Sequence, residues 1–115
     1  MLREFIAFDN RLTGRLPGLR NMTQLGVFDV HGNNLTGEIP SVLDAPSLQE
    51  FNVDHNQLTG PPPLPVPLNF HTNARLCPNA LDHVESAEWD KATGVTPWYR
   101  DCVLPDAVFA DGFDG

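Results

Sequence analysis

The chain has 115 residues with a formal net charge of −8 at pH 7, and it contains 11 prolines, 9 glycines and 2 cysteines. This length allows one domain, and the acidic balance disfavours nucleic acid as a partner, because binding a phosphate backbone requires a basic patch. The sequence has no run of about 18 apolar residues, so it predicts no membrane span. So many prolines and glycines are unusual in a compact helical domain and are typical of a chain that turns at regular intervals.

Three stretches of the chain follow the same pattern. They read LREFIAFDNRLTGRLP at residues 2–17, LGVFDVHGNNLTGEIP at 25–40 and LQEFNVDHNQLTGPPP at 48–63. Each begins 23 residues after the previous one, and this period is that of a repeat protein. We expect a short strand in the first ten residues of each repeat and a sharp turn at each Thr-Gly pair, where glycine can take a positive φ.

An asparagine follows each expected strand. A buried amide side chain both donates and accepts hydrogen bonds, so stacked asparagines should form a structural ladder rather than a binding site. The third repeat ends in the proline run PPPLPVPL, and we interpret residues 66–71 as a fourth, terminal strand after a shortened return path. The ladder predicted in this way consists of Asn10, Asn33, Asn56 and Asn73.

The repeats stop near residue 76, and a different segment follows. Ser86 to Thr93, ending at Gly94, has the signals of a short helix. The two tryptophans and the tyrosine lie in this segment, where they are expected to cover the end of the core; an aromatic ligand site is the alternative. The domain prediction is therefore repeats at 2–24, 25–47, 48–64 and 65–76, a cap at 77–102 and an acidic tail at 103–115.

The two cysteines, Cys77 and Cys102, both lie in the predicted cap. An even count in a segment that closes a repeat array favours one disulfide, which would stabilise the fold by roughly 3–4 kcal/mol in the chain-entropy model. Two free thiols are the alternative. A disulfide indicates an oxidising compartment, so we expect a secreted or cell-surface protein, extracellular or periplasmic.

The form LxxFxVxxNxLTGxIP resembles the leucine-rich repeats of plant receptor ectodomains and polygalacturonase-inhibiting proteins. The resemblance implies an α/β fold, a right-handed solenoid with a parallel concave sheet and short 3₁₀ or irregular convex segments, closed by a small C-terminal cap. It also implies protein recognition as the general role. The string LCPNAL followed by SAEWDKATGVTPWYRDC is similar to the cap of many secreted gammaproteobacterial leucine-rich repeat proteins, and VFADGFDG resembles their short acidic ends.

Side chains that alternate along the predicted strands define the concave face. The candidate protein-binding residues on it are Glu4, Ile6, Phe8, Val27, Asp29, His31, Glu50, Asn52, Asp54, His55, Asn69 and His71. Equivalent positions of adjacent repeats should lie about 5 Å apart, which makes Asp29 a neighbour of Asn52 and places His31 beside Asp54. With carboxylates and histidines but no lysine or arginine, this face should attract a basic protein partner.

Three other interpretations of the sequence stay open. The face can be polar for solubility only, with the repeats acting as a structural terminator or spacer. The chain can inhibit a glycan-degrading enzyme, an idea that rests on fold-level resemblance. Asp54, His31, His55 and His71 are metal-type ligands, but ligands from separate strands rarely converge, so no metal or cofactor is predicted.

We expect no enzymatic activity, because no nucleophile with an adjacent base and no cleft with paired carboxylates is indicated. The chain opens on the first position of a repeat with no capping element before it. Repeat arrays need such an element to cover the first core layer. We therefore expect residues 1–115 to be a fragment, or the C-terminal part of a longer solenoid.

Overall fold

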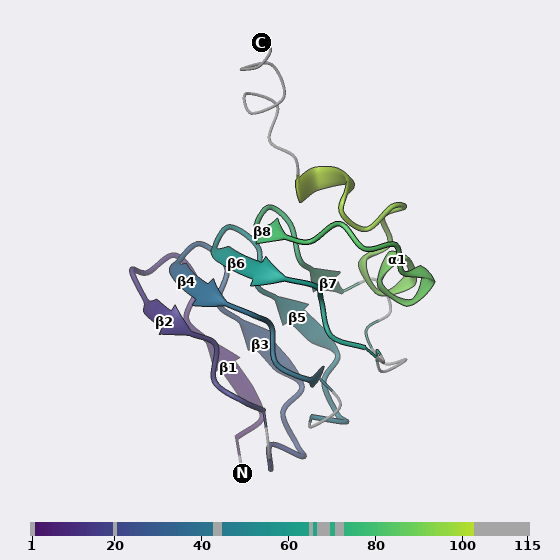
Figure 1. Ribbon diagram of the computed structural model, residues 1–115. Coiled ribbons are helices and arrows are strands. Elements are labelled where there is room, and N and C mark those ends of the chain that lie inside the picture. The colour runs from purple at the N-terminus through teal and green to yellow at the C-terminus, as the bar shows by residue number, and fades with distance from the viewer. Residues whose placement is uncertain are drawn as a thin grey trace.

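The computed structural model describes residues 2–19, 21–42, 45–64, 66, 70 and 73–102. Each repeat contributes one strand to each of two parallel four-stranded sheets (Figure 1). The first sheet, which corresponds to the concave sheet of the prediction, consists of β1 (Glu4–Ile6), β3 (Val27–Asp29), β5 (Glu50–Asn52) and β7 (Ala74–Arg75). The second sheet consists of β2 (Thr13–Arg15), β4 (Asn34–Gly37), β6 (Gln57–Gly60) and β8 (Ala80–Leu81).

The second sheet was not predicted, since its strands lie where the sequence indicated only turns. In β4 the burial pattern alternates, with Leu35 buried between the exposed Asn34 and Thr36. Such a short polar segment becomes a strand because its backbone pairs with equivalent segments of adjacent repeats. The expected positive φ of the glycine is present at the end of the strand, at 82° for Gly37.

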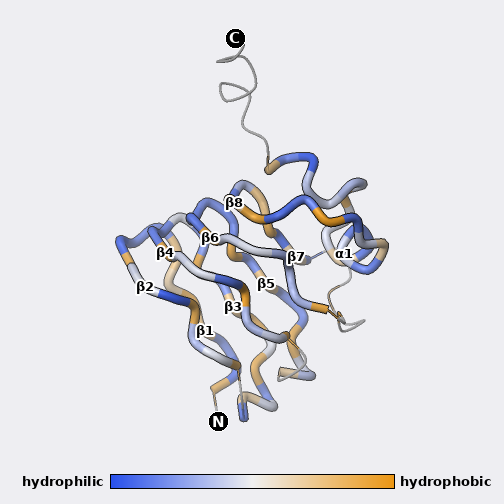
Figure 2. The backbone as a smooth tube through the Cα atoms, in the orientation of Figure 1, coloured by the Kyte–Doolittle hydropathy of each residue, from blue (hydrophilic) through white to orange (hydrophobic). Residues whose placement is uncertain are grey.

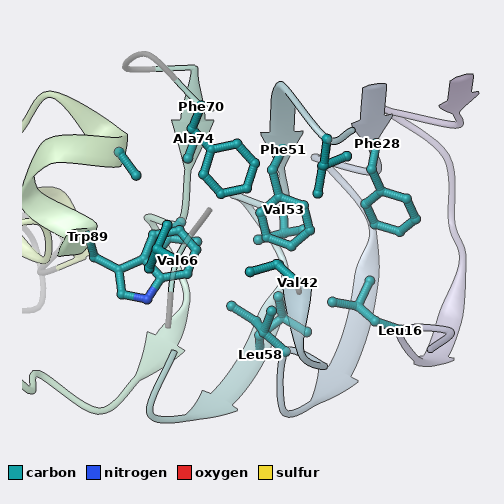
Figure 3. Close-up of a cluster of buried hydrophobic side chains, with 14 of the residues drawn as sticks. Leu16, Phe28, Val42, Phe51, Val53, Leu58, Val66, Phe70, Ala74 and Trp89 are labelled. Carbon is teal, nitrogen blue, oxygen red and sulfur yellow. The ribbon is translucent and has the colours of Figure 1, made fainter. Parts of the chain in front are cut away.

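The core lies between the two sheets and is held by a column of stacked rings. The rings of Phe28 and Phe51 lie 5.8 Å apart, those of Phe51 and Phe70 6.0 Å apart, and those of Phe70 and Trp89 6.0 Å apart, between centroids (Figure 3). Ala74 is the register partner of Phe51 and has no ring of its own, so Phe70 supplies the ring for the fourth layer. Burying each ring stabilises the fold by roughly 1.5–3 kcal/mol.

The asparagine ladder connects each repeat to the one before it. The Asn56 amide group donates to the carbonyls of Val30 and Val53 at 3.1 Å, and its oxygen accepts from the backbone N–H of Leu35 at 3.0 Å. Asn33 makes the equivalent bonds one repeat earlier, to Ala7, Val30 and Leu12. Asn10, in the first repeat, is exposed and donates within its own turn.

Asn79, and not Asn73, continues this ladder, and this corrects the prediction. The Asn79 amide donates to the carbonyls of Val53 and Leu76 at 2.8 Å and accepts from the N–H of Leu58 at 2.9 Å. The fourth repeat therefore keeps the 23-residue spacing from Asn56. The sequence predicts a shortened return path at the proline run because Phe70 and Asn73 match the repeat pattern in a register that the structure does not adopt.

The C-terminal segment closes the core beyond β7. Helix α1 (Ala87–Thr93) begins after Ser86, whose hydroxyl accepts from the Trp89 N–H, and ends at Gly94 with φ of 73°, which confirms the predicted helix. Trp89 is fully buried, and its indole N–H donates to the Pro63 carbonyl at 2.8 Å. The ring therefore covers the last core layer, as predicted, and is not available to a ligand. Figure 1 shows α1 beside β7 at the end of the stack.

The second tryptophan of the cap is fixed in the same way. Trp98 is 2% exposed and donates its indole N–H to the carbonyl of Val84 at 2.7 Å. The disulfide between Cys77 and Cys102 joins the end of the fourth repeat to η2 (Arg100–Cys102), a 3₁₀ turn. The predicted acidic tail at 103–115 lies outside the described residues.

The hydropathy of the chain agrees with a layered fold. Hydrophilic and hydrophobic residues are interleaved along both sheets (Figure 2), as expected where one side of each strand faces the core. No helix in the described part of the chain is both long and apolar enough to cross a lipid bilayer.

Replacing Asn79 by alanine should lower the free energy of unfolding by about 2–4 kcal/mol, because one buried N–H and two carbonyls lose their partner. Asn73→Ala is the matched control and should change it by less than about 0.5 kcal/mol, since that side chain is on the surface. Urea unfolding of both variants measures the difference. Equal destabilisation would contradict the ladder assignment given above.

Candidate functional site

The outer face of the first sheet carries its side chains in register. The first outward row consists of Glu4, Val27 and Glu50, and the second of Ile6, Asp29 and Asn52. The prediction that Asp29 and Asn52 are neighbours on adjacent strands is therefore confirmed. A regular sheet is what brings these residues together, because each is separated from the next by a whole repeat.

The second row continues at a residue that the sequence prediction missed. β5 pairs with β7, so that Asn52 lies beside Arg75. The strand that pairs with β5 is thus Ala74–Arg75, later in the chain than the predicted fourth strand at 66–71, most of which lies outside the described residues. The face carries an arginine where none was predicted. Counting 23 residues from Asn52 would have found Arg75. The predicted site residues Asn69 and His71 lie outside the described residues.

A hydrogen-bonded group holds the middle of this face in one arrangement. One carboxylate oxygen of Asp29 accepts from the backbone N–H of His31 at 3.2 Å and contacts its ring Nδ1 at 2.5 Å. The amide of Asn52 donates to Glu50 at 2.9 Å and to Asp29 at 3.4 Å. Two adjacent strands are therefore joined by their outward side chains, and the carboxylates are fixed before any partner binds.

Asp54 follows β5 and is the most buried carboxylate of the face, at 6% exposure. Its Oδ2 is 2.7 Å from the ring Nδ1 of His55, whose side chain is largely exposed. Its Oδ1 is buried and has no hydrogen-bond partner among the described residues. A buried carboxylate oxygen without a hydrogen-bond partner is energetically unfavourable.

The side of the face nearest the first repeat is apolar. Ile6 is 53% exposed and Phe8 is 46% exposed. The ring of Phe8 lies parallel to the ring of His31, with 4.9 Å between centroids. Exposed aromatic rings are enriched at protein–protein contacts.

The protonation of His31 is coupled to this face. Burial lowers its pKa, but the hydrogen bond that its ring donates to Asp29 and the charges of Asp29, Asp54 and Asp9 together outweigh burial, so that the pKa of His31 lies above its ordinary value of 6.5. Folding therefore shifts the protonation equilibrium of His31 toward the charged imidazolium, relative to the unfolded chain.

Two hollows open on this side of the molecule. The first has a volume of about 240 Å³ and is lined by His31, Glu50, Asn52, Asp54, Asn73 and Arg75. The second, about 280 Å³, lies toward the cap and is lined in part by Asp54, Arg75, Val95, Trp98 and Asp101. Asp54 and Arg75 line both hollows and separate them.

The described side chains of this face offer hydrogen-bonding and charged groups, and among them no metal-binding cluster is formed. Among the residues that the structure describes, no group of three His, Cys, Asp or Glu side chains is placed to hold a metal ion. Of the residues considered as metal ligands, Asp54 pairs with His55 and His31 pairs with Asp29, while His71 is not among the described residues.

Comparison with known proteins identifies the repeats. Residues 24–45 and 47–67 match the family model described as Leucine Rich Repeat. A solved structure titled "Crystal Structure of a Pollen Receptor Kinase 3" has a TM-score of 0.50 and 24% sequence identity, over 70% of this chain and 37% of that chain. At that identity the likeness concerns the fold alone, and this chain spans little more than a third of that structure. No curated protein matches the chain.

The fold and the two matched segments together define a leucine-rich repeat solenoid. Solenoids of this class stack repeats into an extended surface, and they generally mediate protein–protein interaction. The first sheet of the present structure has an extended outer face, with its residues at the positions given above.

The raised pKa of His31 predicts a specific pH dependence. The stability that protonated His31 contributes is fully present below pH 6.5 and is lost as the pH rises through the raised pKa. Between about pH 6 and pH 8, wild type should therefore lose more stability than the His31→Gln variant. Urea unfolding at both pH values measures this difference.

His83→Gln is the control, since His83 lies in the cap and stacks on Tyr99. It should show the pH dependence of wild type. If His31→Gln keeps the full wild-type loss, then Asp29 does not stabilise the protonated ring.

Proposed function

We propose that the outer face of the first sheet binds a protein partner with a basic surface, and that the chain acts outside the cytoplasm as a non-enzymatic recognition module. The observation that carries this proposal is the set of carboxylates fixed on that face. Asp29, Glu50 and Asp54 each accept a hydrogen bond from a neighbouring side chain. Fixed groups lose little conformational entropy when a partner binds.

The charge of the face supports a basic partner. Its carboxylates are Glu4, Asp9, Asp29, Glu50 and Asp54, and they are opposed by Arg75 and by His31 when it is protonated. Such an acidic surface attracts a basic protein during encounter and disfavours an acidic one. The apolar contact area needed for affinity is provided beside it by the exposed Ile6 and Phe8.

The location outside the cytoplasm is supported by the disulfide between Cys77 and Cys102, because disulfides persist in oxidising compartments. The similarity of residues 77–102 to the caps of secreted bacterial leucine-rich repeat proteins supports it as well. The same similarity favours a bacterial surface or exported protein over a plant receptor.

Reversing one charge on the face should abolish capture of the partner. The immobilised protein is presented with the extracellular proteins of its source organism, and bound proteins are identified by mass spectrometry. Glu50→Lys should reduce the yield of a basic partner at least about tenfold, equivalent to about 1.4 kcal/mol, and added salt should reduce it further.

Gln57→Lys is the matched control, because Gln57 is exposed on β6 of the same repeat, in the other sheet. It should retain the partner. If both variants capture the same proteins in the same amounts, the outer face of the first sheet is only solvated, and the repeats are left with a structural role.

A further inference from the structure

The end of the stack at β1 and β2 leaves apolar side chains uncovered. Of the seven large hydrophobic residues that are exposed in the described part of the chain, five lie in the first repeat: Leu2, Phe5, Ile6, Phe8 and Leu12. Figure 1 shows β1 and β2 together at this end of the stack, opposite helix α1. A concentration of exposed apolar side chains indicates an interaction surface.

The aromatic column of the core ends at the same place. The ring of Phe5 stacks on that of Phe28 with 5.4 Å between centroids. Phe5 is nevertheless 37% exposed, whereas Phe28 is 2% exposed, because among the described residues Phe5 has a stacked ring on one side only. At the other end of the column Trp89 is fully buried. The column can therefore be extended past Phe5 and not past Trp89.

The backbone of β1 has an edge that pairs with no strand of the described chain, since β1 is the first strand of its sheet. The N–H groups of Ala7 and Asp9 donate to carbonyls of the second repeat at 2.9 Å. Successive residues of a strand direct their backbone groups to opposite edges, so the N–H and C=O groups of Glu4 and Ile6 face away from β3. An edge of this kind can accept another strand.

The charge of this end differs from that of the rest of the chain. Residues 2–19 carry three arginines and two carboxylates, a net charge of +1, whereas residues 20–115 carry four basic and thirteen acidic side chains, a net charge of −9. Like charges repel when two copies of one protein approach. Two copies of this acidic chain therefore repel each other least when they meet at β1 and β2.

We propose that this end binds a second copy of the chain about a two-fold axis, with β1 antiparallel to β1 of the second copy and the two Phe5 rings at the contact. Glu4 of each copy then lies opposite Ile6 of the other, so no like charges are opposed. The same rotation brings β2 toward β2 of the second copy. Because the cap closes the other end of each stack, the association stops at a dimer.

The dimer goes beyond the proposed function and does not depend on it. Pairing uses the edge of β1, so the outer faces of the two first sheets stay accessible and become continuous across the axis. Glu50 lies on β5, two strands away from the contact. Glu50→Lys should therefore remain dimeric, whether or not it captures a protein partner.

The test is sedimentation equilibrium of the whole chain between about 5 μM and about 0.5 mM, because the population of a dimer follows the protein concentration. The mass should rise from that of one chain to that of two and go no further. A mass of one chain over the whole range would overturn the proposal. Growth beyond two chains would overturn it as well, since it requires a contact that does not close.

Proline at position 6 tests the strand edge. Ile6→Pro removes an N–H that faces the second copy and leaves the bonds to β3 in place, so dimerisation should weaken at least about tenfold. Ile6→Ala is the matched control, since it keeps that N–H, and it should weaken dimerisation much less. Equal weakening in both variants would contradict strand pairing. If Ile6→Pro fails to fold, Glu4→Pro and Glu4→Ala take their places, because Glu4 begins the strand and faces the same edge.

A disulfide between copies tests the register. No free cysteine is present among the described residues, where Cys77 and Cys102 are paired, so an introduced cysteine is the one thiol available. Directly opposed residues that exchange no hydrogen bonds have Cα atoms about 4.5 Å apart, which a disulfide can span. Mild oxidation of Phe5→Cys should therefore give a covalent dimer.

Gln57→Cys is the control for chance collisions, because Gln57 is exposed on β6, away from the contact. It should stay free of covalent dimer under the same oxidation. Absence of the crosslink in a Phe5→Cys sample that sediments as a dimer would overturn the pairing of β1 with its copy, and so would equal crosslinking of the two variants.

Discussion

The stacking of the repeats depends on a hydrogen-bonded asparagine that spans two of them. Asn56 and Asn79 each accept from an N–H of the preceding repeat and donate to carbonyls on both sides of the boundary. These groups would otherwise be buried without partners, which is costly. The ladder thereby holds each repeat at a spacing of 23 residues. The rows on the outer face follow from that spacing, because a slip of one residue would turn every outward side chain into the core.

The aromatic column continues into the fourth repeat although the repeat's sequence differs there from that of the earlier repeats. The fourth repeat has Ala74 at the position of Phe51, yet Phe70 places its ring over Phe51 and carries the stack to Trp89. The Trp89 ring can be buried at the end of the core because its indole N–H donates to the Pro63 carbonyl. The cap is thus part of the core stack as well as its cover, and the disulfide attaches it to the fourth repeat.

On the outer face of the first sheet, the regular backbone places polar side chains in rows. Three carboxylates of this face, those of Asp29, Glu50 and Asp54, are buried or partly buried and hydrogen-bonded, and Asn52 joins Asp29 to Glu50 across two strands. Asp54 differs from the others because its unpaired oxygen, Oδ1, is buried, as judged within the described residues.

The repeat period, the first three strands of the first sheet, the capped helix before Gly94 and the role of the tryptophans could be predicted from the sequence, because apolar spacing and capping residues are local signals. The second sheet could not, since segments such as Asn34–Gly37 become strands only by pairing with their neighbours. Asn79 and Arg75 were missed because the proline run and Asn73 suggested a false register. Only the tertiary structure shows that Asp54 Oδ1 is buried without a hydrogen-bond donor among the described residues. Both properties depend on how β5 and β7 pack, and the residue pattern does not specify that packing.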